Sequence, residues 1–363
     1  MTPCGENLFR DPLVNDIKAA GGVLRRGDLT LRLPRVFGFC GGVTRAVRLL
    51  KDECAKSAGR DIWLLGPIIH NDAVNAWFRE RGVRIASEDA PQYCFEHASP
   101  SDCFVIPAFG LPRPVQNQLA EFADSNARIV DTTCPYVARI WDFVERQADF
   151  GRTVVIHGKP GHPETNGILS RALRRSNAAV LVPDLEHAAI LARAVRDNNP
   201  ARYQERLCHQ AENLDLANMA CVSQTTMLYS ETERVADLLR SVAEETRGKL
   251  QTMNTVCRAT QERQDAAREL CRIKCDLRIV IGGFDSSNTN RLQTLAANAG
   301  PAYFIRDEKA IGENCIRHYD PSLGREASTV NWRSTGPMEI GILAGASCPD
   351  GIIGNVIRRL LKS

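Results

Sequence analysis

The sequence alternates short apolar segments with longer amphipathic ones, and this alternation constrains the fold more than any other feature. Most of the apolar segments are followed by a loop of Gly, Ser, Thr or Asn and then by a segment with helical periodicity. The expected strands are residues 62–65, 104–106, 128–130, 153–156, 220–222, 277–281 and 340–343. Repeated strand–helix units predict an α/β fold with mostly parallel sheets covered by helices.

A chain of 363 residues predicts two or three domains, at ~100–200 residues each. Two polar stretches, 198–218 and 324–337, are expected to be long connections, the first a surface insertion. We expect an N-terminal extension followed by three α/β domains and a C-terminal strand and helix that complete the core. The expected boundaries are 1–34, 35–133, 134–256, 257–337 and 338–363.

Composition excludes several classes of protein. With 44% hydrophobic and 25% charged residues, the chain is neither disordered nor fibrous. No apolar run reaches the ~18 residues of a membrane helix, and a net charge of +3 is too small to favour nucleic acid as a partner. The first 35 residues lack the apolar core of a signal peptide and are acidic for a transit peptide. We therefore expect a bacterial cytoplasmic protein that binds neither membrane nor nucleic acid.

The 13 cysteines do not indicate a disulfide framework, because their number is odd and no secretion signal precedes them. The absence of a Cys-x-x-Cys pair argues against a zinc ribbon or a thioredoxin-type site. Cys271 and Cys275 are spaced i, i+4 and are expected on one packed face of a helix over 259–275.

Cys40, Cys134 and Cys257 share one predicted setting, between the end of a strand and the start of a helix. The helices are expected over 43–58 and 135–148, with the third helix over 259–275. A helix N-terminus favours the thiolate, which is the form that binds metal. Spacings of 94 and 123 residues place one cysteine in each of three α/β units. Three thiolates suit an iron–sulfur cluster with one open iron or a Cys₃ zinc site, and packing without any metal stays open.

Eight further motifs occur in a fixed order between residues 35 and 361. They are Gly38-Phe39-Cys40-Gly41-Gly42-Val43-Thr44-Arg45-Ala46, Ile69-His70-Asn71, Asp131-Thr132-Thr133-Cys134-Pro135, Gly161-His162-Pro163-Glu164, Gln224-Thr225-Thr226, Ala259-Thr260-Gln261-Glu262-Arg263-Gln264, Ser286-Ser287-Asn288-Thr289-Asn290-Arg291-Leu292 and Ala344-Gly345-Ala346-Ser347. Together they resemble the 4-hydroxy-3-methylbut-2-enyl diphosphate reductase family (LytB), and most of all its plant and cyanobacterial branch.

The resemblance implies a trefoil of three pseudo-symmetric α/β domains around one [4Fe–4S] cluster per chain, with Cys40, Cys134 and Cys257 as ligands. It implies a two-electron reductive dehydroxylation to isopentenyl and dimethylallyl diphosphate, the last step of the methylerythritol phosphate pathway. Ferredoxin or flavodoxin would supply the electrons.

The residues themselves suit a diphosphate, which needs hydroxyls, amides, imidazoles and backbone N–H groups around it. The candidate ligands all follow expected strand ends or lie in matched motifs: His70, His162, Thr225, Ser286, Ser287, Asn288 and Ser347.

Glu164 matches the family's general acid, and Thr225 would relay or orient the proton. Thr225 and Thr226 could also cap a helix expected over 231–246.

Phe109 departs from the pattern, because many bacterial members have a substrate-binding His there. Lys159 is a candidate for cationic compensation, although a loop lysine is usually solvated. Three alternatives remain: a quinolinate-synthase-like dehydratase, a reductase of another allylic alcohol, and a non-catalytic cluster protein that senses redox state. The first has no reason to contain the Gly-His-Pro-Glu and Ser-Ser-Asn motifs, and Glu164 with Thr225 argues against the last.

Overall fold

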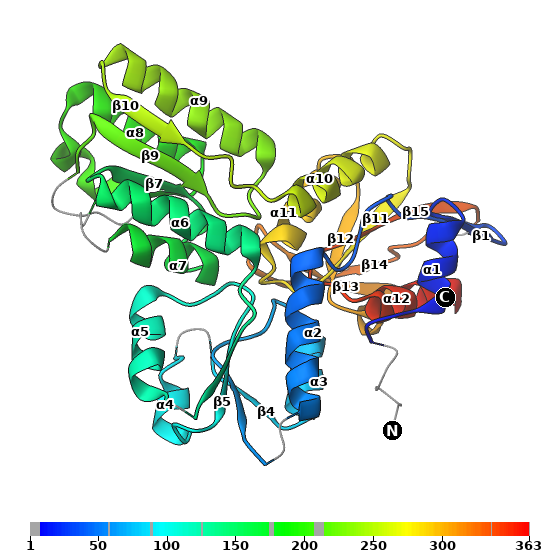
Figure 1. Ribbon diagram of the computed structural model, residues 1–363. Helices are drawn as coiled ribbons and strands as arrows, with labels where there is room; N and C mark the ends of the chain where they lie inside the picture. Colours follow the sequence, from blue (N-terminus) through cyan, green and yellow to red (C-terminus); the bar gives the residue numbers. More distant parts are fainter. Residues whose placement is uncertain are drawn as a thin grey trace. The chain divides into compact units, whose positions relative to one another are not determined.

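The computed structural model describes residues 8–56, 59–87, 90–124, 126–173, 178–206, 214–334 and 336–362. The chain divides into two compact units (Figure 1). Unit 1 comprises Met1–Thr44, Ile69–Trp77 and Arg258–Ser363, and unit 2 comprises Arg45–Ile68 and Phe78–Cys257. The predicted α/β class with mostly parallel sheets is confirmed in both units. None of the helices described in these ranges is long and apolar enough to cross a membrane.

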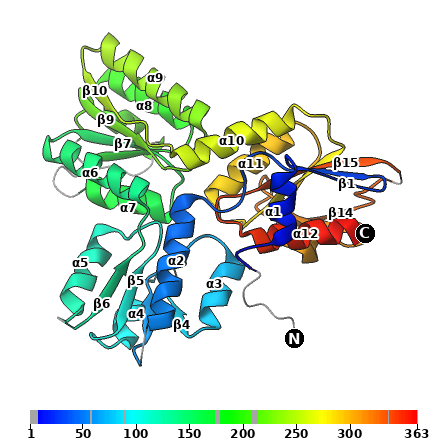
Figure 2. The same ribbon diagram turned by 45° about the vertical axis from the view of Figure 1, so that its right-hand side comes forward.

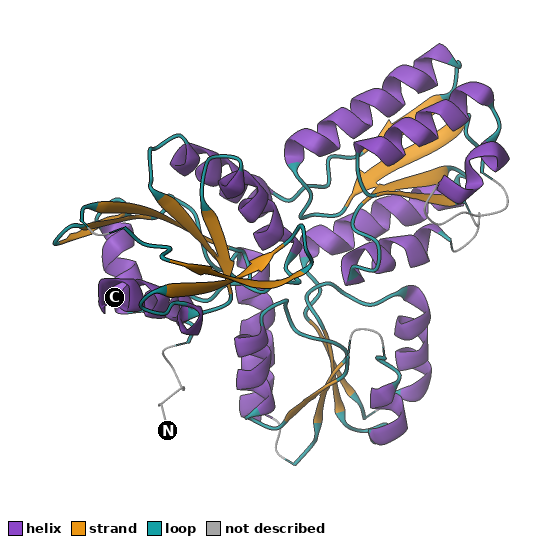
Figure 3. Ribbon diagram, turned by 180° about the vertical axis from the view of Figure 1, so that it is seen from behind, coloured by secondary structure: helices purple, strands orange, loops and turns teal. Residues whose placement is uncertain are grey.

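Unit 1 contains a seven-stranded sheet in the order β1-β2-β15-β11-β12-β13-β14 (strands in orange in Figure 3). The four strands from β2 to β12 are parallel, and the outer pairs are antiparallel. The strands are β1 (Val23–Arg26), β2 (Leu29–Arg32), β11 (Leu277–Ile281), β12 (Ala302–Ile305), β13 (Cys315–Asp320), β14 (Arg325–Val330) and β15 (Met338–Ala344).

The helices of unit 1 are α1 (Pro12–Ala19), α10 (Arg258–Cys271), α11 (Ser287–Ala297), α12 (Asp350–Lys362) and the short η2 (Glu308–Ala310). Two more, α2 (Gly41–Lys56) and α3 (Asp72–Arg79), begin in unit 1 and end in unit 2. Apolar side chains of α10 and α11 pack on the central strands, where Val280, Phe304 and Leu343 are buried.

Unit 2 contains two four-stranded sheets, both entirely parallel, in the orders β4-β3-β5-β6 and β10-β9-β7-β8. The strands are β3 (Ile62–Leu64), β4 (Val83–Ile85), β5 (Cys103–Ile106), β6 (Arg128–Asp131), β7 (Thr153–His157), β8 (Ala179–Val182), β9 (Asn218–Ser223) and β10 (Lys249–Thr252). The helices are α4 (Tyr93–His97), α5 (Arg113–Phe122), α6 (Pro135–Asp149), α7 (Pro163–Ala172), α8 (Leu185–Asp197), α9 (Tyr229–Glu245) and η1 (Pro200–Arg206).

The alternating side-chain directions along β7 show that helices cover both faces of its sheet. Val154 and Ile156 pack with side chains of α6 and α7, and Val155 packs with side chains of α8 and α9. The two helix pairs cover opposite faces of this sheet (Figure 1). Strands covered on both faces are mostly apolar, which is why the sequence reveals them as near-continuous runs. All seven expected strands are present. Strands such as the polar, largely exposed β10 escaped detection because they lack such a run.

Two expectations about long segments need correction. Residues 23–32 were assigned to an N-terminal extension, but β2 pairs in parallel with β15 and Leu31 is fully buried. Residues 324–337 were expected to be a connection, but they contain β14, a polar edge strand held by antiparallel pairing with β13. Part of the expected insertion at 198–218 forms η1, and residues 207–213 lie outside the described residues.

The helix expected over 259–275 ends at Cys271, so the prediction that Cys271 and Cys275 share a helix face is wrong. The guanidinium of the buried Arg278 donates to the carbonyl oxygens of Cys271 (3.2 Å) and Ile273 (3.1 Å). These bonds satisfy carbonyl groups at the helix end and stop the helix there.

Candidate functional site

Three side chains of unit 2, which we call the Glu164 cluster, lie where β7 and β9 end: His162, Glu164 and Thr225. Glu164 is buried in the first turn of α7. Thr225 donates to its two oxygens, from the backbone N–H at 2.6 Å and from the hydroxyl at 2.8 Å. Burial raises the pKa of Glu164 to about 7, although the two Thr225 bonds lower it in part. A carboxyl group with this pKa can hold a proton and release it near neutrality.

His162 is the N-cap of α7, and its Nδ1 accepts a hydrogen bond from the Glu164 N–H at 3.2 Å. In this arrangement the ring proton is on Nε2, because Nδ1 is the acceptor. The Phe109 ring stands edge-on to the imidazole, with centroids 5.7 Å apart. Phe109 therefore borders the cluster as an apolar neighbour and adds no charge.

Two of the three candidate cysteines are hydrogen-bonded next to this cluster. The Cys257 N–H donates to the carbonyl oxygen of Thr225 at 3.1 Å, and the Cys134 N–H donates to that of Ala108 at 2.9 Å. Ala108 precedes Phe109, which contacts His162. Unit 2 thus links the Cys257 loop to the Glu164 cluster through a backbone hydrogen bond, and the Cys134 loop through the backbone of Ala108 and the ring of Phe109.

Thr225 and Thr226 do not cap the following helix, because α9 begins at Tyr229 with Leu228 as its N-cap. Gln224 is a buried residue to which the sequence analysis gave no role, although it lies in a quoted motif. Its amide oxygen accepts from the Lys159 N–H at 3.0 Å and from the Thr165 hydroxyl at 3.3 Å. It therefore ties the segment after β9, which carries Thr225, to the loop that contains Lys159 and to α7, which carries Glu164.

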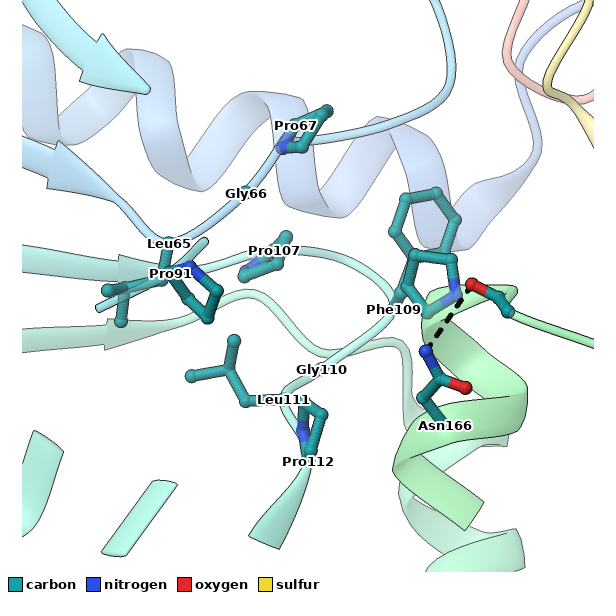
Figure 4. A pocket seen from close by; sticks show the side chains of 12 residues that line it. Leu65, Gly66, Pro67, Pro91, Pro107, Phe109, Gly110, Leu111, Pro112 and Asn166 are labelled. Atoms are coloured by element: carbon teal, nitrogen blue, oxygen red, sulfur yellow. Dashed lines mark hydrogen bonds between the residues drawn. The ribbon is translucent and has the colours of Figure 1, made fainter. Parts of the chain in front are cut away.

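A small proline-rich hollow of about 50 Å³, partly open to solvent, adjoins Phe109 (Figure 4). Asn166, which lines one side of it, donates to the nearby Gly161 carbonyl oxygen at 3.3 Å (Figure 4). Gly110 has φ +74° and lies so close to Trp141 that an added Cβ would be 2.0 Å from the indole ring. Only glycine fits there, and the backbone that carries Phe109 is held in place as a result.

Unit 1 holds a second group at the ends of β11 and β15, which we call the Asn288 cluster: Ser286, Asn288 and Ser347. Ser286 caps α11, its Oγ accepting from the Thr289 N–H and hydroxyl. The Asn288 side-chain oxygen accepts from the Ala346 N–H at 2.9 Å, while its buried Nδ2 has no acceptor among the described residues. A buried amide donor of this kind points to a ligand with acceptor oxygens.

Ser347 joins this cluster to His70. Its Oγ donates to the His70 carbonyl oxygen at 3.1 Å and lies 3.4 Å from the Ser286 Oγ. The His70 carbonyl also lies against Gly283, where an added Cβ would approach it to 2.5 Å. Ser287, the first residue of α11, is buried beside Ser286. Unit 1 thus brings together the five candidate ligands that it contains.

Cys40 belongs to the same region, since its N–H donates to the Ala346 carbonyl oxygen at 3.2 Å. Its Sγ accepts from the Val43 N–H at 3.4 Å, in the first turn of α2. The strand expected before Cys40 is absent, because residues 36–39 form an irregular loop. Arg263, another motif residue without a predicted role, holds this loop by donating twice to the Gly38 carbonyl oxygen.

The cysteines differ in their fitness to bind metal. Burial raises the pKa of Cys94 to about 11 and those of Cys103 and Cys221 to about 12, and it also raises the pKa of Cys348. Thiols of this kind are inert.

Cys40, Cys134 and Cys257, by contrast, are partly exposed, and each directly precedes a helix. These three thiols therefore suit a metal–sulfur group better than the buried ones. In neither unit do three Cys, His, Asp or Glu of the described residues form a group that could hold a metal ion, and the three cysteines belong to both units.

Curated proteins of one enzyme family match this chain over almost its whole length. Curated 4-hydroxy-3-methylbut-2-enyl diphosphate reductases of Gloeobacter violaceus and Trichormus variabilis are 36% and 34% identical over 98% of this chain, covering 88% and 90% of their own lengths.

Two solved structures are similar in fold. The Plasmodium falciparum reductase has a TM-score of 0.67 at 20% identity over 90% of this chain and 86% of its own. A structure described as the terminal enzyme of the non-mevalonate pathway has a TM-score of 0.56 at 26% identity, over 92% of this chain and 99% of its own.

The profile of the LytB protein family matches residues 31–361, which includes both clusters and all three candidate cysteines. With this match and the full-length identity to curated relatives, the chain belongs to the LytB family, that of the 4-hydroxy-3-methylbut-2-enyl diphosphate reductases.

Proposed function

We propose that this protein reduces 4-hydroxy-3-methylbut-2-enyl diphosphate to isopentenyl and dimethylallyl diphosphate, the last step of the methylerythritol phosphate pathway. The observation that carries the proposal is the buried Glu164, whose pKa is raised to about 7 beside the candidate diphosphate ligand His162. The reaction breaks the allylic C–O bond and consumes two electrons and two protons. One proton leaves in water with the hydroxyl oxygen, and the other is added to the allyl group.

Cys40, Cys134 and Cys257 are the proposed ligands of one [4Fe–4S] cluster per chain. When bound, the cluster supplies the two electrons one at a time and an open iron for the substrate oxygen. Partial exposure and a position before a helix make these thiols the best-suited donors among the described cysteines. Reduced ferredoxin or flavodoxin is the proposed donor of electrons, by family membership, and the bacterial cytoplasm is the proposed location.

The proposed ligands of the diphosphate are His70, His162, Thr225, Ser286, Ser287, Asn288 and Ser347. Asn288 Nδ2 is available to donate, and His162 in the present arrangement offers its Nε2–H. Each hydrogen bond to a charged group contributes about 1.5–3 kcal/mol.

Glu164 is the proposed general acid, since hydroxide is a poor leaving group and a positioned acid contributes about 10²–10⁴-fold in rate. Thr225 holds both carboxyl oxygens, so it orients the acid and can pass its proton to the substrate oxygen. We also propose three domains, residues 35–133, 134–256 and 257–337 completed by 338–363, each with one sheet.

The proposal is tested with anaerobically purified protein, reduced methyl viologen and the hydroxylated diphosphate. We expect turnover to both products and a brown chromophore. Single Ser substitutions of Cys40, Cys134 or Cys257 should abolish or destabilise the chromophore. Cys271→Ser and Cys348→Ser, as matched controls, should keep it, and the opposite pattern would refute the ligand assignment.

A further inference from the structure

The N-terminal segment of unit 1 lies against the loop that carries Cys40. This loop, residues 37–40, comes before α2 and has no strand pairing of its own. Phe9 packs on Phe39, the neighbour of Cys40, with ring centroids 6.2 Å apart. Lys18, at the other end of α1, places its ammonium 4.7 Å from the centre of the Phe37 ring. The two side chains thus touch the loop on both sides of Gly38.

Both contacts start from a firmly anchored segment. Asp11 is buried, caps α1 by accepting from the Leu13 N–H, and forms a two-point ion pair with Arg358 of α12 at 2.7 and 2.9 Å. Gly354 leaves the room that Asp11 needs, because a Cβ there would lie 2.2 Å from the carboxylate. Figure 2 shows α1 beside α12. A buried, paired carboxylate of this kind fixes the position of the helix start.

The loop of residues 37–40 also packs closely against the Asp350 carboxylate at Gly38. Gly38 has φ +71°, and a Cβ on it would lie 3.1 Å from the Asp350 carboxylate. The same carboxylate accepts from the Lys18 ammonium at 3.0 and 3.2 Å. Lys18 therefore holds the carboxylate against which Gly38 packs, in addition to its contact with Phe37. On the remaining side, Phe9 stands edge-on to Trp77 at 5.1 Å.

We propose that Phe9 and Lys18 are positioning residues, a brace by which the N-terminal segment holds residues 37–40 and so fixes the Cys40 thiol for its metal–sulfur group. The inference rests on the proposed role of Cys40 as a ligand. It gives a function to a segment that the sequence alone presents as an extension.

The test measures hydrogen exchange of residues 36–44, by mass spectrometry, together with the rate at which a chelator bleaches the chromophore of anaerobically purified protein. Phe9→Ala removes the ring contacts to Phe39 and Trp77, so it should raise local exchange and bleaching about two- to tenfold through local opening of the loop. Phe9→Tyr, which keeps the ring, should restore wild-type values. Lys18→Met, which keeps the length but removes the charge, should show a smaller increase and tests the brace even if Phe9→Ala fails to fold.

Tyr303→Ala is the matched control, because it removes a half-buried ring of unit 1 that packs on His318 at 5.1 Å. If Phe9→Ala and Tyr303→Ala have equal effects, the change is general destabilisation and the proposed brace is wrong. Wild-type hydrogen exchange in Phe9→Ala would also contradict the proposal. Cys40→Ser is measured alongside. If Cys40→Ser retains a stable chromophore, the proposed ligand role fails, whereas a bleached Cys40→Ser with an unaffected Phe9→Ala means that only the brace fails.

Discussion

The Glu164 and Asn288 clusters both follow the ends of parallel strands, but they handle polarity in opposite ways. Among the described residues no cation pairs with the buried Glu164, and both its oxygens accept from Thr225. In the Asn288 cluster the described partners are all neutral, and one buried amide donor has no acceptor. Burial of a hydrogen-bonded carboxyl group shifts its pKa. A buried neutral donor without an acceptor can instead bind an anion. The first arrangement suits a residue that transfers a proton, and the second suits residues that bind the substrate.

Of the substitutions that test the difference between the two clusters, Glu164→Gln should have the largest effect on the rate. Gln keeps the size and accepts from Thr225 but releases no proton, so we expect kcat to fall at least about a hundredfold with a normal chromophore and normal diphosphate affinity. Steady-state rates at matched cluster content provide the measurement. A carboxylate that only pins the loop would leave Glu164→Gln almost as fast as the wild type.

The same variant reports on stability. The raised pKa means that folded Glu164 keeps its proton up to about pH 7, whereas in the unfolded chain it ionises near its ordinary value. The wild type therefore loses stability as pH rises toward 7, by a few kcal/mol at about 1.4 kcal/mol per pKa unit. Calorimetric Tm values should fall less between pH 5 and pH 8 in Glu164→Gln than in the wild type.

Asn288→Ala should weaken binding of inorganic diphosphate and of substrate by about tenfold or more, because it removes a hydrogen bond to a charged group. Isothermal titration measures this, with an unchanged chromophore. Thr294→Ala, an exposed substitution on the same helix, is the control and should bind normally. Equal affinity in the two variants would remove Asn288 from the anion site.

Thr225→Val tests how the hydrogen bond from Thr225 affects the pKa of Glu164. The Thr225 hydroxyl bond lowers the pKa of Glu164, so its loss should raise that pKa and move the alkaline limb of kcat to higher pH, by about one unit at most. Since the protonated acid is the active form, the wild-type rate should fall above about pH 7. Thr225→Ser should keep the wild-type profile, and a limb that moves to lower pH would contradict the assignment.

Lys159→Ala should have the smallest effect. The Lys159 backbone forms two hydrogen bonds, from its N–H to Gln224 and from the His162 N–H to its carbonyl oxygen, whereas its side chain is exposed. We expect KM to change by less than about twofold, as for most exposed charges. A tenfold rise in KM that salt abolishes would instead make Lys159 the cationic compensation considered from the sequence.

Local patterns in the sequence were sufficient for much of this protein. Largely apolar runs identified strands buried on both faces, such as β7 and β11, because such burial leaves few polar positions in the strand. Pro135, directly after Cys134, marked the start of α6, since proline suits the first turn of a helix. The eight ordered motifs indicated the family and the candidate ligands.

Tertiary structure decided what depends on partners far apart in the chain. The end of α10 depends on the guanidinium of Arg278. The N-terminal segment joins unit 1 because β2 pairs with β15, more than 300 residues away. The raised pKa of Glu164 requires burial and the approach of Thr225, 61 residues away. Sequence patterns record which surfaces are buried, whereas electrostatics and helix ends depend on which groups meet, and only the folded chain determines that.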